Sequence, residues 1–250
     1  PAINVFPRFV AVSESEATLE VAARIANDGA SAADGTIRLS LRAPDGKEVA
    51  RLETLPRTVP AKGGWDCRPR LSVKRPQLWH PDSPSLYTLR TTALVDGKPV
   101  DEVTQRLGIR WLEVKAEGLF VNGKPFVPRG ANRHNDYPFI GNAIPDNAQY
   151  RDAKLLKDAG FNFLRLAHYP QSPAFLDACD ELGIFVMECI PGWQHFDQDP
   201  AFTETLVTRP AARAVPVKLL VRYYPGAGFY VRGGLGIYSV RATYLYRHEL

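Results

Sequence analysis

Apolar and polar positions alternate with a period of two through residues 1 to 112, the pattern of strands that bury one face. In ATLEVAARIAN the apolar side chains fall on one face, and Asp28-Gly29 follows as a turn; these side chains are Leu19, Val21, Ala23 and Ile25. GTIRLSLRAPDG repeats the pattern before Pro44-Asp45-Gly46, and SLYTLRTTALV ends at Asp96-Gly97. Short strands with regular turn signals predict an antiparallel β-sandwich.

From about residue 113 the pattern changes. GLFVNGKPFVPRG predicts a hairpin around Asn122-Gly123, followed by a strand that ends at GANRHND. DNAQYRDAKLLKDAG predicts a helix with Asp146 or Asn147 as N-cap and Gly160 just past its end. The side chains predicted on its buried face are Ala148, Leu155, Leu156 and Ala159.

A second strand, a second helix and a third strand follow. FNFLRLAHYP and IFVMECIPGW are the strands, and SPAFLDACDELG predicts a helix that starts at Ser172-Pro173 and ends at Gly183. The side chains predicted to be buried on this helix are Phe175, Leu176, Cys179 and Leu182. Alternation of strands and helices predicts the opening of a parallel α/β fold.

Conspicuous polar and aromatic residues follow the ends of these three strands. In parallel α/β barrels the side chains that do chemistry come from the carboxyl ends of strands, which meet at one face. The first strand end carries Asn132, Arg133, His134 and Asp136; the second carries Arg165, His168 and Tyr169; the third carries Glu188, Trp193 and His195. A lone histidine at a strand end is more often structural, but two at neighbouring ends make a shared pocket an equal alternative.

The other strand-end residues each have a structural alternative. Arg165 precedes His168 by three residues, so the two point to opposite faces unless the strand has already ended, and Arg165 then suits an ion pair. Trp193 suits a cap on the barrel wall or a platform for a sugar ring. Glu188 suits a pair with Arg165 or a contact to sugar hydroxyls. A metal site on His134, His168 and His195 lacks the HxH or HExxH pattern, so we expect no metal.

Charge and composition exclude several classes of function. Residues 201–250 hold seven Lys or Arg and two Glu, so the positive charge of this segment alone is larger than the net charge of +4 of the whole chain. The rest of the chain is therefore near neutral, and we expect no nucleic-acid partner. There is no GxGxxG or Walker pattern, and we expect no cofactor. Cys67, Cys179 and Cys189 suit free thiols. Without a long apolar run or a signal-peptide pattern, we expect no membrane association, and no pattern specifies compartment or oligomeric state.

Several long motifs resemble glycoside hydrolase family 2, the β-galactosidase and β-glucuronidase group. They are PQLWHPDSPSLYTL, RLGIRW, FVNGKPFVPRGANRHND and RDAKLLKDAGFNFLRLAHYPQSPAFLDACDELGIFVMECIPGW. The resemblance implies an immunoglobulin-like β-sandwich followed by a TIM barrel, a carbohydrate substrate with a terminal β-glycoside, and hydrolysis with retention. It implies that His134, Arg165 and His168 line the sugar subsite. His195 falls near a metal-binding histidine of some galactosidases, but Trp193 stands where their glutamate ligand is expected.

The sequence departs from this family in ways that bear on activity. The family's acid/base glutamate follows an Asn, yet no Asn occurs after Asn162, and only Glu204 and Glu249 follow position 200. The catalytic carboxylates are therefore not identified, and we expect the chain by itself to be inactive. Residues 201–250 hold six of the ten tyrosines and no Asp, Asn or Gln, which would suit a truncated gene end in a shifted reading frame or a genuine basic segment.

These observations predict three regions. Residues 1–112 form the sandwich, residues 113–200 form the first part of the TIM (β/α)8 barrel, and residues 201–250 are an atypical basic tail. Two alternatives to a β-galactosidase-like hydrolase fragment remain. One is a non-catalytic carbohydrate-binding or interaction module built on the sandwich. The other is a truncated product without function, prone to association through exposed strand edges.

Overall fold

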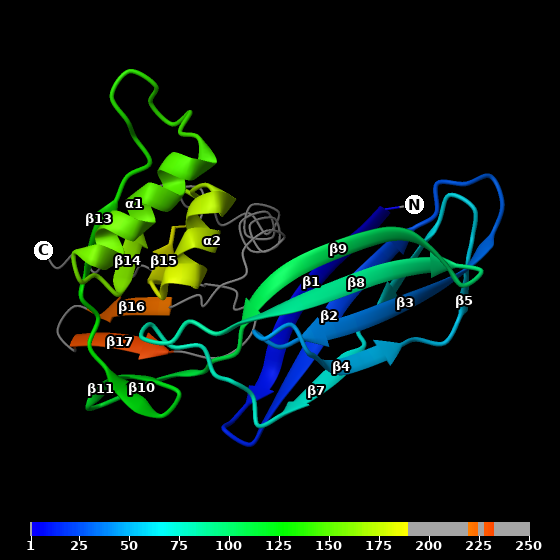
Figure 1. Cartoon of the computed structure of the whole chain (residues 1–250), viewed down its shortest axis with the longest axis horizontal. Coiled ribbons are helices and arrows are strands. Elements are labelled where there is room, and N and C mark those ends of the chain that lie inside the picture. Colours follow the sequence, from blue (N-terminus) through cyan, green and yellow to red (C-terminus); the bar gives the residue numbers. More distant parts are fainter. Residues whose placement is uncertain (1, 190–219, 225–227, 233–250) are drawn as a thin grey trace, which may run out of the picture.

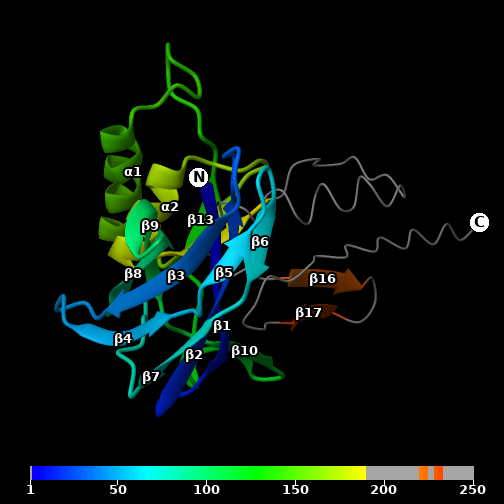
Figure 2. The same cartoon turned by 90° about the vertical axis from the view of Figure 1, so that its right-hand side faces the viewer.

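The computed structural model describes residues 2–189, 220–224 and 228–232, with side chains from Val5 to Cys189. Two antiparallel sheets form its N-terminal half (Figure 1, Figure 2). The first contains β1 (Ala2–Val12), β2 (Glu16–Ala26), β6 (Gly64–Cys67) and β7 (Arg70–Lys74), with β6 and β7 both paired to β2. The second contains β4 (Glu48–Glu53), β3 (Ala33–Arg42), β8 (Leu86–Val95) and β9 (Lys98–Gly108), and β5 (Arg57–Val59) also pairs with β3.

The sandwich core follows the predicted alternation. Leu19, Val21, Ala23 and Ile25 of β2 are all buried, as are Ile37, Leu39 and Leu41 of β3. Their inward faces pack together with Leu71, Tyr87, Leu89 and Leu107 from the neighbouring strands. The predicted turn at Asp96-Gly97 joins β8 to β9 with both residues at positive φ, as a two-residue hairpin requires. The predicted β-sandwich is therefore confirmed.

A small antiparallel sheet leads from the sandwich to the α/β unit. It contains β10 (Leu112–Lys115), β11 (Gly118–Val121) and β12 (Lys124–Phe126), with the predicted turn at Asn122-Gly123 between the last two strands. The three parallel strands are β13 (Gly130–Arg133), β14 (Phe163–Leu166) and β15 (Phe185–Glu188), paired in that order. Helices α1 (Asp146–Asp158) and α2 (Pro173–Leu182) connect them, which confirms the predicted order of elements.

Helix α2 begins and ends as predicted, with Phe175 and Cys179 buried but Leu176 and Leu182 only partly buried, and α1 matches its prediction in part. Ser172 caps α2 by accepting a hydrogen bond from the Ala174 N–H, Pro173 is its first residue, and Gly183 follows in the left-handed conformation. Helix α1 is capped by Pro145, with no side-chain cap bond, so the predicted Asp146 or Asn147 cap is wrong. Its buried residues are Gln149 and Ala153, whereas Leu155 is 53% exposed and Ala159 is also exposed.

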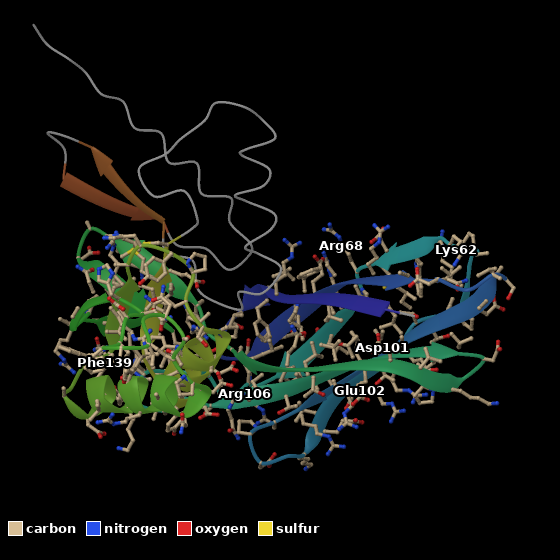
Figure 3. All side chains as sticks on the ribbon, turned by 90° about the horizontal axis from the view of Figure 1, so that it is seen from above. Lys62, Arg68, Asp101, Glu102, Arg106 and Phe139 are labelled. Atoms are coloured by element: carbon tan, nitrogen blue, oxygen red, sulfur yellow. The ribbon has the colours of Figure 1, made fainter. Side chains whose placement is uncertain are left out.

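The sandwich and the α/β unit meet at a tight junction. Trp79 is fully buried, donates its indole N–H to the Asp180 carbonyl at 2.8 Å, and packs edge-on against Phe185. Arg106 of β9 forms an ion pair with Glu181 of α2, where the two halves touch (Figure 3). A Cβ on Gly183 would lie 2.1 Å from the Pro81 carbonyl oxygen, so both its φ of 75° and its packing require glycine.

Arg110 is buried at the same junction. Its guanidinium lies over the Trp79 ring at 4.4 Å, and burial lowers the pKa of Arg110. Burial also raises the pKa of Asp180 to about 6, against the opposing effect of the Arg110 charge.

Two further strands, β16 (Leu220–Tyr224) and β17 (Gly228–Arg232), pair antiparallel. Cys67, Cys179 and Cys189 are free cysteines. Within the described ranges, no helix is both long and apolar enough to cross a membrane.

Candidate functional site

The carboxyl ends of the parallel strands form one edge of their sheet, which we call the mouth and define by Arg133, Leu166 and Glu188, the last residues of the three strands. Register places Arg133 beside Leu166 and Asn132 beside Arg165. Leu166 packs into the apolar layer beneath the helices, so Arg133 faces that layer as well. Asn132 and Arg165 therefore lie on the opposite face of the sheet.

His134, Arg165 and His168 come together at the mouth. The His134 and His168 rings lie edge to face with their centroids 5.4 Å apart. Nη2 of Arg165 lies 3.1 Å from Nδ1 of His168, and its Nη1 donates to Oδ1 of Asn132 at 3.5 Å. β14 ends at Leu166, which allows Arg165 and His168 to approach each other despite their three-residue spacing. The Ala167–His168 peptide bond is cis.

The contact with Arg165 defines the proton positions on His168. A guanidinium has only donors, so Nδ1 of His168 accepts this hydrogen bond and the proton of the neutral ring lies on Nε2. Burial lowers the pKa of His168, and the positive charge of Arg165 and the neighbouring His134 lower it further. His168 is therefore a neutral imidazole at neutral pH, able to bond a hydroxyl without bringing a charge.

Beneath these residues lies a cluster that we call the mouth network: the buried Arg133, Asn135, Gln149 and Gln171, and the partly buried Asp152. Nη2 of Arg133 donates to Oδ2 of Asp152 at 2.7 Å and to Oε1 of Gln149 at 2.9 Å. Its Nη1 donates to Oδ1 of Asn135 at 3.3 Å and to Oε1 of Gln171. The guanidinium also lies over the Phe175 ring at 3.8 Å. Both terminal nitrogens of the Arg133 guanidinium thus exchange water contacts for protein acceptors.

The loop that follows His134 is anchored to the same network. The Tyr137 hydroxyl donates to Oδ1 of Asp152 at 2.5 Å, and this bond is the main cause that raises the pKa of Tyr137. Backbone hydrogen bonds of 3.1 and 2.9 Å join Tyr137 to Gly141. Figure 2 shows the loop between β13 and α1 rising above the two helices.

The candidate residues fall into three groups. His134, Arg165 and His168 are brought together, as an arrangement lining one pocket requires. Arg133 instead faces the helix layer and serves the mouth network, and Glu188 accepts a 3.3 Å hydrogen bond from the Gln171 N–H. Trp193 and His195 lie outside the described residues.

Sequence reasoning missed Asn135, Gln149 and Gln171. All three are buried, with exposed fractions of 8%, 1% and 7%. A polar residue in a loop or on a helix is normally exposed, so composition and spacing gave no signal for them. All three accept hydrogen bonds from Arg133, whose guanidinium needs several acceptors once the fold buries it in the α/β layer.

In the part of the chain that the structure describes, no group of three or more His, Cys, Asp or Glu side chains is arranged to hold a metal ion. The candidate His195 lies beyond that part. Chemically, the described mouth offers the guanidinium of Arg165, the imidazoles of His134 and His168 and the amide of Asn132, beside the carboxylate of Glu188. This set suits hydroxyl-rich ligands.

Family models match almost the whole described chain. The model for "Glycosyl hydrolases family 2" matches residues 3–110, and the model for "Glycosyl hydrolases family 2, TIM barrel domain" matches residues 112–207. The chain belongs to glycosyl hydrolase family 2. Its fold is accordingly an immunoglobulin-like sandwich followed by the start of a TIM barrel, as the sequence predicted.

Curated relatives in family 2 carry two enzyme names. A β-galactosidase of Thermoanaerobacter pseudethanolicus is 42% identical over 132 residues, which are 52% of this chain and 18% of that protein. A β-glucuronidase of Bacteroides fragilis is 37% identical over 164 residues, which are 64% of this chain and 23% of that protein. The chain thus spans about a fifth of the length of these relatives, and the family assignment does not select between the two activities.

Solved family 2 structures have the same arrangement. A β-glucuronidase of Bacteroides uniformis superposes with a TM-score of 0.75 at 29% identity, covering 84% of this chain and 26% of that one. A putative β-galactosidase of Bacteroides fragilis also gives a TM-score of 0.75, at 27% identity, covering 84% of this chain and 31% of that one. The described fold therefore matches 26% and 31% of the length of these two structures.

Proposed function

We propose that the mouth is one wall of the sugar-binding site of a retaining, β-galactosidase-like hydrolase. In the proposed organisation, residues 1–112 are the sandwich, residues 113–200 the first part of the barrel, and residues 201–250 a separate basic tail. His134, Arg165 and His168 contact the hydroxyls of the terminal sugar, and Trp193 supplies a surface for its ring. The observation that carries the proposal is the convergence of the first three residues, with His168 and Arg165 bonded at 3.1 Å.

The chemistry of this wall fits an uncharged sugar. His168, whose pKa is lowered by burial and by the Arg165 charge, presents a mainly neutral imidazole at pH 7. Arg165 adds a permanent charge, and Asn132 adds an amide whose Oδ1 already accepts from Arg165. Sugar hydroxyls both donate and accept, so such a mixed set orients them. The same charge at Arg165 would also suit the carboxylate of a glucuronide, the second candidate sugar.

We expect no turnover from this chain by itself. A retaining glycosidase needs one carboxyl group to protonate the leaving oxygen and a second to attack the anomeric carbon. The sequence holds no Asn-Glu pair after Asn162, and Glu188, the carboxylate among the residues that define the mouth, accepts a hydrogen bond from the Gln171 N–H. Binding without hydrolysis is therefore the expected behaviour.

Ligand-detected NMR and chromogenic assays on the purified chain test this proposal together. We expect methyl β-galactoside or methyl β-glucuronide to bind weakly, with binding lost in His168→Ala and retained in the matched control His80→Ala, whose histidine lies in the loop after β7. We expect no hydrolysis of chromogenic β-galactoside, β-glucuronide or β-mannoside. Binding that survives His168→Ala would refute the site. Turnover that His168→Ala abolishes would reveal catalytic carboxylates within the chain.

A further inference from the structure

Gln171 lies in the loop between β14 and α2 and makes hydrogen bonds to both outer strands of the parallel sheet. Its side chain Nε2 donates to the Arg133 carbonyl at the end of β13 at 2.8 Å, and its Oε1 accepts from Arg133 Nη1. Its backbone N–H donates to Oε1 of Glu188 at the end of β15 at 3.3 Å. One residue of the β14 loop therefore joins all three strand ends of the mouth.

A second bond connects the same two loops. The Asn135 N–H donates to the Tyr169 hydroxyl at 3.1 Å. Arg133 and Asn135 are the residues on either side of His134, while Tyr169 directly follows His168 and Gln171 lies two residues further on. The segment holding His134 is thus tied on both sides to the segment holding His168. The 5.4 Å separation of the two rings is the geometry that these bonds maintain.

Gln171 is almost fully buried, so solvent exposure does not explain its polarity. It is 7% exposed and sits where an apolar side chain would fill the space at lower desolvation cost. Its amide nitrogen donates to the backbone carbonyl of Arg133, and its amide oxygen accepts from the side chain of the same residue. A buried amide that is fully paired in this way fixes one relative placement of two loops.

We propose that Gln171 is the positioning residue of the sugar-binding mouth, which holds His134 and His168 at the spacing that a sugar requires. The proposal rests on the function proposed above and adds a residue that touches no sugar. Its role is to act through Arg133 on one loop and through its own backbone on the other. Supporting groups of this kind keep first-contact residues within a fraction of an ångström of productive geometry.

Gln171→Met tests the proposal because methionine keeps the length and removes both amide bonds. The Arg133 carbonyl then loses its Nε2 partner and Nη1 loses one acceptor, so we expect the two loops to separate. Nuclear Overhauser contacts between the His134 and His168 rings should weaken. The pKa of His168 should rise, since His134 is one of the groups that lower it. Sugar affinity should fall roughly tenfold, as for the loss of one or two buried hydrogen bonds.

Two further variants separate positioning from stability. Gln105→Met is the matched control, because it removes a half-buried glutamine amide, bonded to the Val5 carbonyl at 3.5 Å, from the sandwich. We expect it to leave ring contacts, His168 pKa and sugar affinity unchanged. Gln171→Glu keeps an acceptor for Arg133 but loses the donor, so its changes should be smaller than those of Gln171→Met. It also provides a folded variant should Gln171→Met unfold the α/β unit.

The outcomes are distinguishable. If both Gln171 variants remain folded and keep the ring contacts and the pKa of His168, Gln171 is merely structural and the proposal is wrong. Neither measurement requires a sugar, so they test positioning even if the proposed function fails. If the contacts between the two rings change while a measurable sugar affinity does not, Gln171 positions the two histidines but this positioning does not affect sugar binding. That outcome overturns the link between positioning and binding.

Discussion

The sandwich core and the mouth network both lie between two layers of structure, but the first consists of apolar side chains and the second of polar ones. The sandwich core consists of alternating aliphatic residues such as Leu19, Leu39 and Leu89, each with no exposed surface. The mouth network places a guanidinium, a carboxylate and three amides in the equivalent position between sheet and helices. Apolar contacts, which any apolar neighbour can supply, stabilise the sandwich core. Hydrogen bonds between particular atoms stabilise the mouth network.

This difference decides what each region tolerates. Apolar burial is non-directional, so a sandwich core accepts related side chains at modest cost. A polar network is favourable only while all its members are satisfied, because each orphaned group keeps its full desolvation penalty. The mouth therefore has a single well-defined arrangement, which suits a binding site.

Removing Arg133 gives the largest effect that we expect. Arg133→Met leaves Asp152, Gln149 and Gln171 without their shared donor, and loss of one partner of a buried ion pair costs about 3–5 kcal/mol. Hydrogen exchange of the β13 and β14 amides measures the loss, which should be confined to the α/β unit. Arg38→Met is the matched control, since Arg38 pairs with Glu53 at 2.7 Å on the sandwich surface and should cost at most about 1 kcal/mol.

Equal effects of the two arginine substitutions would contradict this contrast. The same would hold if Arg133→Met lowered protection in β3 and β8 as much as in β14. In that case the junction at Trp79 and Arg106 would couple the two halves into one cooperative unit.

The sandwich could be predicted in detail because its signals are local. Leu19 to Ile25 alternate, Asp96-Gly97 has the residues that a two-residue hairpin needs, and each strand is read from its own sequence. Ser172, Pro173 and Gly183 likewise mark α2 by their own chemistry. Helix α1 was harder, since Leu155 lies one position off the face defined by Gln149 and Ala153, and a polar Gln149 breaks the apolar stripe.

The site was predictable only where topology acts. His134, Arg165 and His168 were identified because parallel strands bring their carboxyl ends together, whatever the side chains do. Gln171 was not, because its role depends on the orientation of Arg133 toward the helix layer, a long-range feature without a sequence period. The same dependence explains why Arg133 was grouped with the site residues although it lies beneath them.

A smaller effect of opposite sign is expected in the sandwich core, where Thr91 places a hydroxyl without a partner among the described residues. Thr91 in β8 is fully buried, and its hydroxyl has no hydrogen-bond partner among the described residues. Thr91→Val keeps the shape and removes the unpaired group, so it should raise the free energy of unfolding by about 1 kcal/mol. Its neighbour Thr92 donates to Glu102 at 3.1 Å, so Thr92→Val should lower it by about the same amount.

Chemical denaturation of both variants checks this pair. A loss of stability in Thr91→Val would show that the hydroxyl is satisfied in solution. The sandwich core would then resemble the mouth network more closely than the structure indicates.

The smallest expected effect concerns the charge of Arg165. Burial is the largest cause that lowers the pKa of His168, and the Arg165 charge is the second. Arg165→Met should therefore raise this pKa only part of the way toward its ordinary value of 6.5, whereas Arg165→Lys, which keeps the charge, should raise it less. Proton NMR of the imidazole over a pH series measures both shifts.

The sign of the linked stability follows from the same shift. Since the folded chain holds His168 at a lowered pKa, the unfolded chain binds the proton more readily between the two values. The stability that the neutral ring contributes is complete above pH 6.5 and is lost as the pH falls through the folded pKa. Arg165→Met brings the pKa of His168 in the folded chain closer to its value in the unfolded chain. The free energy of unfolding of this variant should therefore fall less steeply on acidification than that of the parent chain. A steeper fall would mean that Arg165 favours the charged ring, which would reverse the electrostatics assigned to the mouth.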